Sequence, residues 1–319
     1  MSHSFLKESK LYIVYGGNKY RIYTDAALDF SQTVAQDSYP VKTLHNQARM
    51  VENSNITTAN AADFSFSVPL TKEKGESPII ALIQGLDSEQ QLTSFDIYVQ
   101  TGSAVFKIDN AHITAADFDI SPNSPFTVRV QGQGTKLERV GNESYDWHSG
   151  FTAPSGSNWD TVGSNQLSAS TRTPLLVYPV VSIDSLDMNN IISTSFSITN
   201  ETTWTSYKTL QKSLLVTNAS NIMRPSDYVV EKRNISGNVV QYQIDDNINQ
   251  FDDFSTTSNI TIKAVEVGKV ASATPFFQIQ LNPASFTARM AVGDVFTQSY
   301  DFRSLDSDTT FANVITQYS

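Results

Sequence analysis

The sequence predicts a mainly β protein with two homologous β-sandwich or barrel domains, each carrying at most a short flanking helix. Three observations predict this fold class. Short runs alternate between apolar and polar residues with a period of two, as half-buried strands do. Asn, Gly, Ser and Pro separate these runs, which is the composition of turns. One segment of the first half also recurs in the second half.

The predicted strands are rich in aromatic and β-branched residues, which favour a pleated, half-buried surface. Each strand is short and is bounded by turn residues. In chain order the runs cover residues 10–14, 64–70, 95–99, 126–130, 196–198, 239–244, 260–267 and 276–281.

One segment of the first half departs from this period and predicts a helix over residues 77–86. Ser77 is a suitable N-cap and Pro78 suits the first helical position. Apolar residues then follow Ile79 at helical spacing. Residues 246–254 predict a second, shorter helix, because Ile248, Phe251 and Phe254 lie three residues apart.

Residues 141–173 interrupt the strand pattern and are interpreted as a linker between the two domains. The segment is rich in Gly, Ser and Asn, yet it also carries Tyr145, Trp147, Phe151 and Trp159. A flexible tether is poor in aromatic residues, so these side chains are expected to dock on a barrel or on a neighbouring subunit. The predicted domains are therefore residues 1–140 and 174–319.

The internal repeat supports this division. Residues 30–45 align without a gap onto residues 196–211, and the same offset of 166 places residues 54–56 on residues 220–222. Nine of 27 positions are identical, where roughly two would coincide by chance at ordinary residue usage. A looser match relates residues 95–97 and 104–106 to 277–279 and 284–286. Duplication of one β-rich domain is the simplest explanation.

Composition excludes several functions. The chain has 22 Lys and Arg against 32 Asp and Glu, a net charge of −10, and no region is positive enough to grip phosphate backbones. It has no cysteine, so disulfides and thiolate chemistry are excluded. No apolar stretch predicts a signal peptide or a membrane span, and we expect synthesis in a cytoplasm and no membrane partner.

Nothing in the sequence predicts catalysis, a cofactor or a metal site, and we expect a protein that is not an enzyme. The histidines lack metal-ligand spacing, and nucleotide-binding or nucleophile motifs do not occur. Close acidic pairs occur at Asp117 and Asp119 and at Asp184 and Asp187, but a glycosidase is recognised by geometry that sequence does not give. The four carboxylates within residues 245–253 leave a calcium site open against a solvated acidic surface.

These segments together resemble the tail tube proteins of long-tailed bacteriophages. The resemblance rests on FSxT…KTL followed by SNI, a short apolar helix, and FDIYVQTGSAVFKIDNAHITAADFDI leading into FTVRVQGQGTKL. In the second half, VSIDSLDMNNIISTSFSITNETTWTSYKTL is similar to the same domain again. The second half has no clear equivalent of the 79–86 helix, and the aromatic linker is not a general feature of the family.

The resemblance implies a structural virion protein that self-assembles into stacked rings and forms a conduit for DNA ejection. A duplicated member implies trimeric rings with pseudo-sixfold symmetry. It also implies contacts with terminator, baseplate or tip proteins, and with a sheath where the tail has one, while DNA passes the lumen without specific binding. The acidic charge suits that passage, or serves solubility alone. Ring or stacking contacts are expected in the repeated elements, at Lys42, Thr43, Leu44, Ser54, Asn55, Ile56, Lys208, Thr209, Leu210, Ser220, Asn221 and Ile222.

Two alternatives remain at this point. Trp147, Trp159 and Trp204 could stack on sugars in a carbohydrate-binding or adhesin-like pair of β-sandwiches. The chain could also be another structural component of a tail or baseplate.

Overall fold

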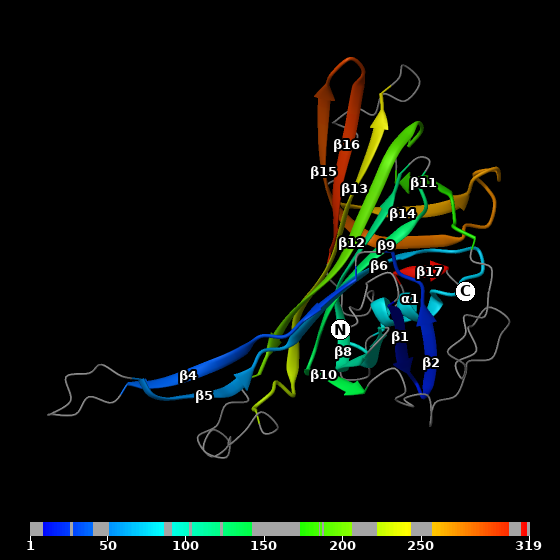
Figure 1. Cartoon of the computed structure of the whole chain (residues 1–319). Helices are drawn as coiled ribbons and strands as arrows, with labels where there is room; N and C mark the ends of the chain where they lie inside the picture. The colour runs from blue at the N-terminus through cyan, green and yellow to red at the C-terminus, as the bar shows by residue number, and fades with distance from the viewer. Residues whose placement is uncertain are drawn as a thin grey trace.

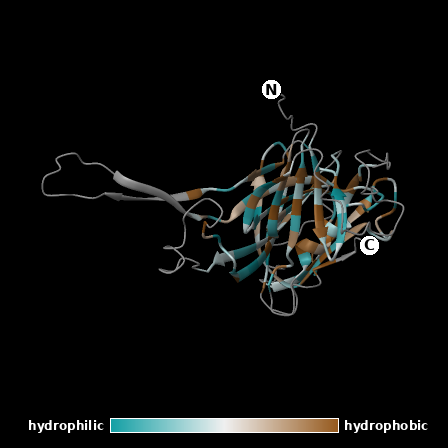
Figure 2. Ribbon diagram, turned by 60° about the horizontal axis from the view of Figure 1, so that its bottom comes forward, coloured by the Kyte–Doolittle hydropathy of each residue, from teal (hydrophilic) through white to brown (hydrophobic). Residues whose placement is uncertain are grey.

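The computed structural model describes residues 9–25, 28–40, 51–85, 91–101, 104–121, 124–141, 173–184, 186, 188–205, 222–243, 257–305 and 314–317. Within these ranges the chain forms seventeen strands and one helix, so the predicted mainly β class is confirmed (Figure 1). Fifteen of the strands belong to one continuous antiparallel sheet that bends through both halves of the chain. Figure 2 shows apolar and polar residues alternating along its strands, as the period-two pattern predicts.

The first half is built around one long bent strand, β8. The first part of β8 pairs with β7 and β10, and the second part pairs with β9. From β7 the sheet continues to β1 and β2, and from β9 it continues to β6 and β3. The elements are β1 (Lys10–Tyr15), β2 (Asn18–Ile22), β3 (Asp29–Ser31), β4 (Val34–Pro40), β5 (Val51–Ala59), β6 (Ala62–Pro69), α1 (Ser77–Gln84), β7 (Phe95–Gln100), β8 (Val105–Ile120), β9 (Thr127–Gly134) and β10 (Lys136–Gly141).

The second half repeats this plan around the long strand β15. The first part of β15 pairs with β14 and β17, and the second part pairs with β16. The sheet continues from β14 to β11, and from β16 to β13 and β12. The elements are β11 (Val177–Ile183), β12 (Ile191–Trp204), β13 (Tyr228–Tyr242), β14 (Thr257–Glu266), β15 (Phe277–Val292), β16 (Phe296–Ser304) and β17 (Ile315–Gln317). Strands β3, β6, β9 and β8 therefore correspond to β12, β13, β16 and β15.

The strand register agrees with the offset found in the sequence. Phe30 and Phe196 are the matched phenylalanines at the start of the repeat. From each of them a row of directly opposed residues crosses the neighbouring strands. In each row a phenylalanine ring covers a glycine of the adjacent strand. A Cβ on either glycine would lie within 2.4 Å of that ring, so no larger residue fits. The rows are Phe30–Phe64–Gly132 and Phe196–Gly237–Phe302, with the ring and the glycine exchanged between strands.

The register also corrects the looser sequence match. Residues 95–97 lie in β7, whereas residues 277–279 lie in β15. Strand β7 corresponds instead to β14, because each pairs with the first part of the long bent strand. Apolar composition common to all core strands explains the false similarity.

The two halves are joined edge to edge, because β12 pairs in antiparallel fashion with the second part of β8. At the centre of this junction Phe196 lies directly opposite Phe118, and their rings stack with centroids 4.4 Å apart. Phe277 lies against both rings, at 5.8 Å from Phe196 and 5.3 Å from Phe118. The junction therefore continues one hydrophobic core from the first half into the second.

Helix α1 is also shared by the two halves. The helix begins one residue after its N-cap, Glu76, so Ser77 is its first residue and not its cap. Arg233 of β13 donates hydrogen bonds to the carbonyls of Ile83 and Gln84 at the other end, at 2.8 and 3.2 Å. A cation is favourable at a helix C-terminus, where the last carbonyls lack partners. A residue of the second half thus completes the only helix among the described residues.

Two strands outside the main sheet form a separate arm. Strands β4 and β5 pair with each other and project away from the body (Figure 1). The first copy of the repeated segment therefore lies partly in two paired strands. The root of the arm contacts the second half, because Ala59 donates a backbone hydrogen bond to Met223 at 2.9 Å. The predicted 246–254 helix and nearly all of the linker, with Trp147 and Trp159, lie outside the described residues.

Candidate functional site

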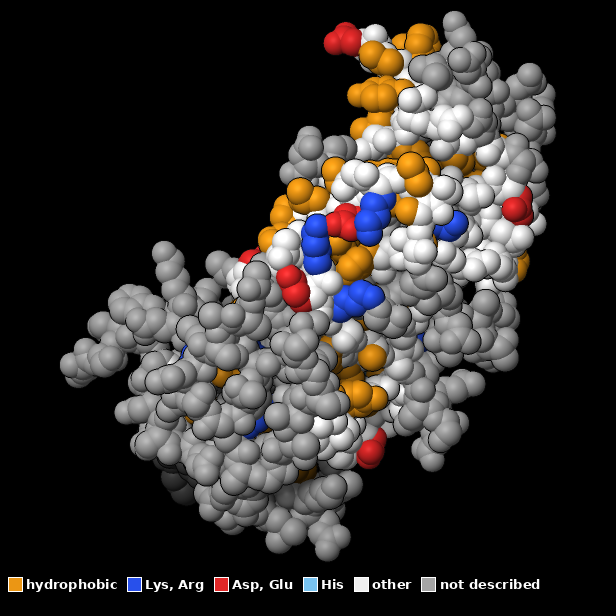
Figure 3. All heavy atoms as spheres, turned by 90° about the vertical axis from the view of Figure 1, so that its right-hand side faces the viewer, with side chains coloured by type: hydrophobic (Ala, Val, Ile, Leu, Met, Phe, Trp, Pro, Cys, Tyr) orange, Lys and Arg blue, Asp and Glu red, His pale blue; other side chains and the backbone are white. Residues whose placement is uncertain are grey.

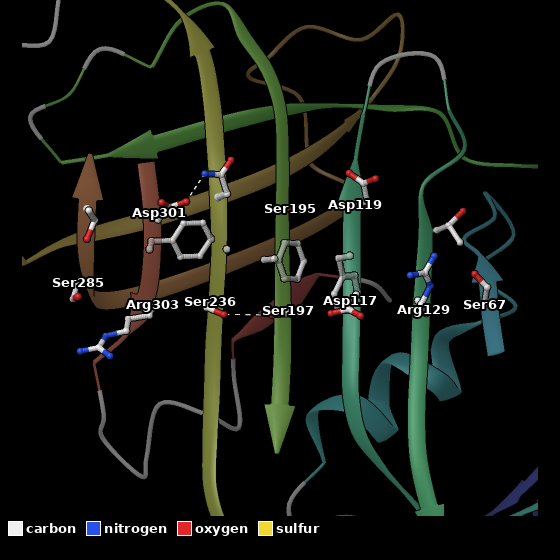
Figure 4. Close-up of a pocket in the computed structure, with 17 residues that line it drawn as sticks. Ser67, Asp117, Asp119, Arg129, Ser195, Ser197, Ser236, Ser285, Asp301 and Arg303 are labelled. Atoms are coloured by element: carbon white, nitrogen blue, oxygen red, sulfur yellow. Dashed lines mark hydrogen bonds between the residues drawn. The ribbon is translucent and has the colours of Figure 1, made fainter. Parts of the chain in front are cut away.

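One face of the sheet is open and polar. It crosses eight neighbouring strands in the order β3, β6, β9, β8, β12, β13, β16 and β15. Their apolar side chains point into the core, and the alternate residues point to the open side. Figure 4 shows polar side chains of β6 to β15 on this side, while α1 lies behind the sheet. They surround a shallow open hollow of about 940 Å³.

Charged residues of both signs lie in two adjacent rows across this face. Arg129 and Asp117 are direct neighbours in the row that also contains Arg303. The next row contains Asp119 and Asp301, and Asp301 accepts a hydrogen bond from Asn238 at 2.5 Å. The face is therefore polar and of mixed charge, with neither sign forming a continuous patch.

The eight strands end in two edges that have no partner within the described part of the chain. Strand β3 pairs with β6 alone, and residues 286–292 of β15 pair with β16 alone. Near the β15 edge, Met290 is 37% exposed, Val292 73% and Phe296 51%. Figure 3 shows hydrophobic side chains gathered at the upper end of the molecule, where Figure 1 places the β15–β16 hairpin. An unpaired strand with exposed apolar residues is suited to pairing with another chain.

A buried aromatic cluster lies at the lower part of the junction between the halves. His112 of β8 is fully buried, and its ring stacks on Tyr228 with centroids 3.9 Å apart. Burial lowers the pKa of His112 to about 4, so the imidazole is neutral at pH 7. Trp204 lies 5.3 Å from His112 and donates its indole hydrogen to Gln133 at 2.8 Å. These contacts give both residues a packing role, whereas the sequence left Trp204 as a candidate for stacking on a sugar.

The acidic residues do not gather into a chemical centre. Among the described residues, no three His, Cys, Asp or Glu side chains lie close enough to hold a metal ion. Asp117 and Asp119 both face the open side of β8, in the wall of a wide hollow. The carboxylates of residues 245–253 lie outside the described residues. The described helix is too short to cross a membrane.

The predicted contact residues are only partly placed by the structure. Ser54, Asn55 and Ile56 lie in β5, in the arm, and Ile222 directly precedes Met223, whose carbonyl accepts the hydrogen bond from the arm. Ile222 therefore lies near the end of β5, the strand that carries Ser54, Asn55 and Ile56. Lys42, Thr43, Leu44, Lys208, Thr209, Leu210, Ser220 and Asn221 lie outside the described residues.

The free edges were missed by sequence reasoning, although a signal existed. Residues 284–292 read ASFTARMAV, and the first four residues alternate as a half-buried strand does. Met290 and Val292 continue the apolar positions at an edge that has no partner among the described strands. Only the register shows that these two positions correspond to Phe118 and Ile120, which are buried at the junction.

A comparison with protein-family models finds the same one twice in this chain. The model described as Bacteriophage Baseplate Tube Protein Family matches residues 1–154 and again residues 142–318. The two matches cover nearly the whole chain and agree with the repeated strand plan. A search of curated proteins finds no significant match.

Proposed function

Because the chain belongs to the bacteriophage baseplate tube protein family, we propose that it is a structural, non-catalytic protein that self-assembles into rings of the tail tube. Three chains form one ring with pseudo-sixfold symmetry, and rings stack into a conduit through which DNA leaves the virion. The family match supports a tail or baseplate component directly. Ring formation rests on the architecture of the sheet.

The observation that carries the proposal is the junction between β12 and β8. This junction joins the second copy to the first by pairing two strand edges. The strand corresponding to β12 in the first copy is β3, and the strand corresponding to β8 in the second copy is β15. Both have an unpaired edge among the described strands. Each chain thus contains one complete junction and the two separate edges from which another junction can form. Chains can pair head to tail through these edges until a ring closes.

The dimensions of such a ring suit a conduit. Eight strands from each of three chains give a wall of 24 strands. With a strand spacing of about 4.8 Å and a tilt of about 40°, the backbone of this wall would be about 48 Å across. The open polar face would line the lumen, since the other face is covered by the remainder of each domain. Side chains would then leave a channel wide enough for a nucleic-acid duplex.

The charges of the open face are consistent with passage and not with tight binding. Asp117 lies directly opposite Arg129, and Asp301 lies two residues from Arg303 on the same strand, so a carboxylate that repels phosphate stands beside each of these arginines. The charge of the whole chain is −10, which adds a repulsive background. Contacts with other tail proteins, such as terminator, baseplate or tip proteins and a sheath where one exists, belong to the ends and the outside of the tube. We place the protein in the virion tail after synthesis in the host cytoplasm.

Mass measurement and electron microscopy of the purified full-length chain test the proposal. Rising protein concentration should convert monomers into rings of three chains and then into stacked rings. A ring of six whole chains would contradict the argument from duplication. A chain that remains monomeric at its highest soluble concentration, both alone and with purified baseplate components, would contradict self-assembly.

A further inference from the structure

The internal junction defines residue by residue how one chain can meet the next. In the junction Phe196 lies opposite Phe118, Ser197 opposite Asp117, and Thr194 opposite Ile120. The same register can be transferred to the free edges once the corresponding residues of each copy are known. This inference rests on the proposed ring, and it adds the register and the contacts of the interface.

The corresponding residues follow from the two rows that begin at Phe30 and Phe196. In the first half the row crosses β6 and β9 and reaches β8 at Ile113. In the second half it crosses β13 and β16 and reaches β15 at Phe286. Strand β8 has an irregularity directly after Ile113, and beyond it Ala115 corresponds to Thr287. Counting along both strands then makes Met290 the equivalent of Phe118.

We infer that β3 of one chain pairs in antiparallel fashion with the free part of β15 of a second copy of this chain, with Phe30 opposite Met290. In the same register Ser31 lies opposite Arg289, and Leu28 lies opposite Val292. Each pair occupies the place that a β12–β8 pair occupies inside the chain. Six such junctions, alternately within and between chains, close the ring.

The side chains at these positions fit a buried interface on the core side. Met290 is 37% exposed and Val292 73% exposed in the single chain, although both stand where the junction buries Phe118 and Ile120. Phe30 and Leu28 are only partly buried, and both pack against the edge of the core. A methionine sulfur beside an aromatic ring is a favourable contact, so Met290 and Phe30 can replace the stacked pair of the internal junction.

The other side chains fit the polar face. Arg289 is exposed on β15, and the pairing brings it to Ser31 of the neighbour and diagonally to Asp29. Diagonal neighbours on one face of a sheet are within reach of long side chains, so a guanidinium and a carboxylate can pair there. The internal junction has Asp117 and Ser195 at the corresponding places. The external interface therefore carries a charge pair that the internal one lacks, which distinguishes the two kinds of junction.

A second copy of the chain is favoured over a different partner because both edges of the interface belong to this sequence. The β3 edge and the β15 edge are complementary in direction, apolar side chains and charge. A different protein would have to reproduce one of these edges. The internal junction shows that this combination of strands forms a continuous core when it is closed.

Cysteine cross-linking tests the register directly, because the chain has no cysteine of its own. Opposed residues of antiparallel strands have Cα atoms about 4.5–5.5 Å apart, which a disulfide can bridge. The chain carrying Ser31→Cys and Arg289→Cys should form disulfides between chains on mild oxidation and yield closed covalent trimers. The chain carrying Ser197→Cys and Asp117→Cys is the matched control, because this equivalent pair should link within one chain.

Two further variants separate the register from the ring itself. Ser31→Cys with Thr287→Cys shifts the pair by two residues, and it should cross-link much less than Ser31→Cys with Arg289→Cys. Rings that form but cross-link preferentially in the shifted pair would overturn the register and leave the proposed function intact. Met290→Asp should abolish rings while leaving thermal unfolding of the monomer unchanged, because Met290 lies at the exposed edge. Rings that form normally with Met290→Asp would overturn the interface.

The absence of rings from the unmodified chain under all conditions has a different meaning. That result would contradict the proposed function, and the register would fail with it. Cross-linking of Ser31→Cys and Arg289→Cys within single chains would also overturn the inference, since the two edges would then meet inside one molecule.

Discussion

The buried imidazole of His112 should make the stability of the chain depend on pH in a specific window. The pKa of His112 is lowered from 6.5 to about 4 by burial, with aromatic rings on two sides. The unfolded chain binds a proton near pH 6.5, whereas the folded chain does not do so until about pH 4. The free energy of unfolding therefore falls as the pH is lowered from 6.5 to 4, and the loss then levels off.

The size of the effect follows from the two pKa values. Linkage gives a loss of about 2 kcal/mol between pH 7.5 and pH 5, and about 3 kcal/mol when the window is fully crossed. Other groups titrate in the same range, so the measured quantity is the difference between the natural chain and His112→Phe. This variant keeps an aromatic ring against Tyr228 and removes the titration.

Urea unfolding of both proteins at pH 7.5 and pH 5 provides the measurement. Between pH 7.5 and pH 5, the free energy of unfolding of the natural chain should fall by about 2 kcal/mol more than that of His112→Phe. Equal losses in the two proteins would refute the reasoning. They would mean that Tyr228 and Trp204 stabilise the imidazolium through cation–π contacts strongly enough to offset its burial.

Three further predictions concern packing and assembly. Replacing Arg233 by Met should lower the free energy of unfolding by about 2–4 kcal/mol, measured by urea titration, because two helix-end carbonyls lose a buried cationic donor. Gly237→Ala should lower the free energy of unfolding by about 1–3 kcal/mol, because the new Cβ would lie 2.3 Å from the carbonyl oxygen of a neighbouring strand. Gly293→Ala is the control, because the nearest atom to its new Cβ would be 3.8 Å away. Changing Lys42 and Lys208 together to Glu should impair tube formation in electron micrographs, since we place these lysines at subunit or ring contacts. Normal tubes with altered genome ejection would place them in the lumen.

The local features of the fold could be predicted from the sequence because their causes are local. Residues 77–86 carry a proline near the first position and apolar residues at helical spacing, and the structure has α1 at residues 77–84. Period-two alternation located β1, β6 and β7 to within two residues. It found the start of β9 but missed the last four residues of that strand. The offset of the repeat was correct between β3 and β12, where the register reproduces it.

The candidate site depends on contacts that the sequence does not encode locally. The pairing of β8 with β12 joins residues about 80 positions apart, and nothing in either strand specifies the other. Arg233 completes a helix about 150 residues earlier in the chain. The exposed edge at Met290 becomes visible only after the register assigns it the place of Phe118. The contacts predicted at Lys42 and Lys208 came from sequence similarity, and they stay predictions.

Residues 174–319 have a net charge of −5 and residues 1–140 a net charge of −3. From these values we expect more acidic side chains of the second half on the wall of the proposed lumen, and no group of basic residues there. The open face carries Arg129 and Arg303, and three of the carboxylates closest to them are Asp117, Asp119 and Asp301, two of which belong to the first half. Net charge of a half therefore does not predict the charge of one of its faces.

The covalent link between the two copies would change the mass action by which the proposed ring closes. Because the β12–β8 junction lies within one chain, half of the junctions in that ring would form at the high effective concentration of a tethered pair. Closing the proposed ring would require the meeting of three molecules instead of six, so the yield of rings would depend on a lower power of the subunit concentration. The same tether would make the two unlike domains alternate around the ring, because each chain always contributes one of each.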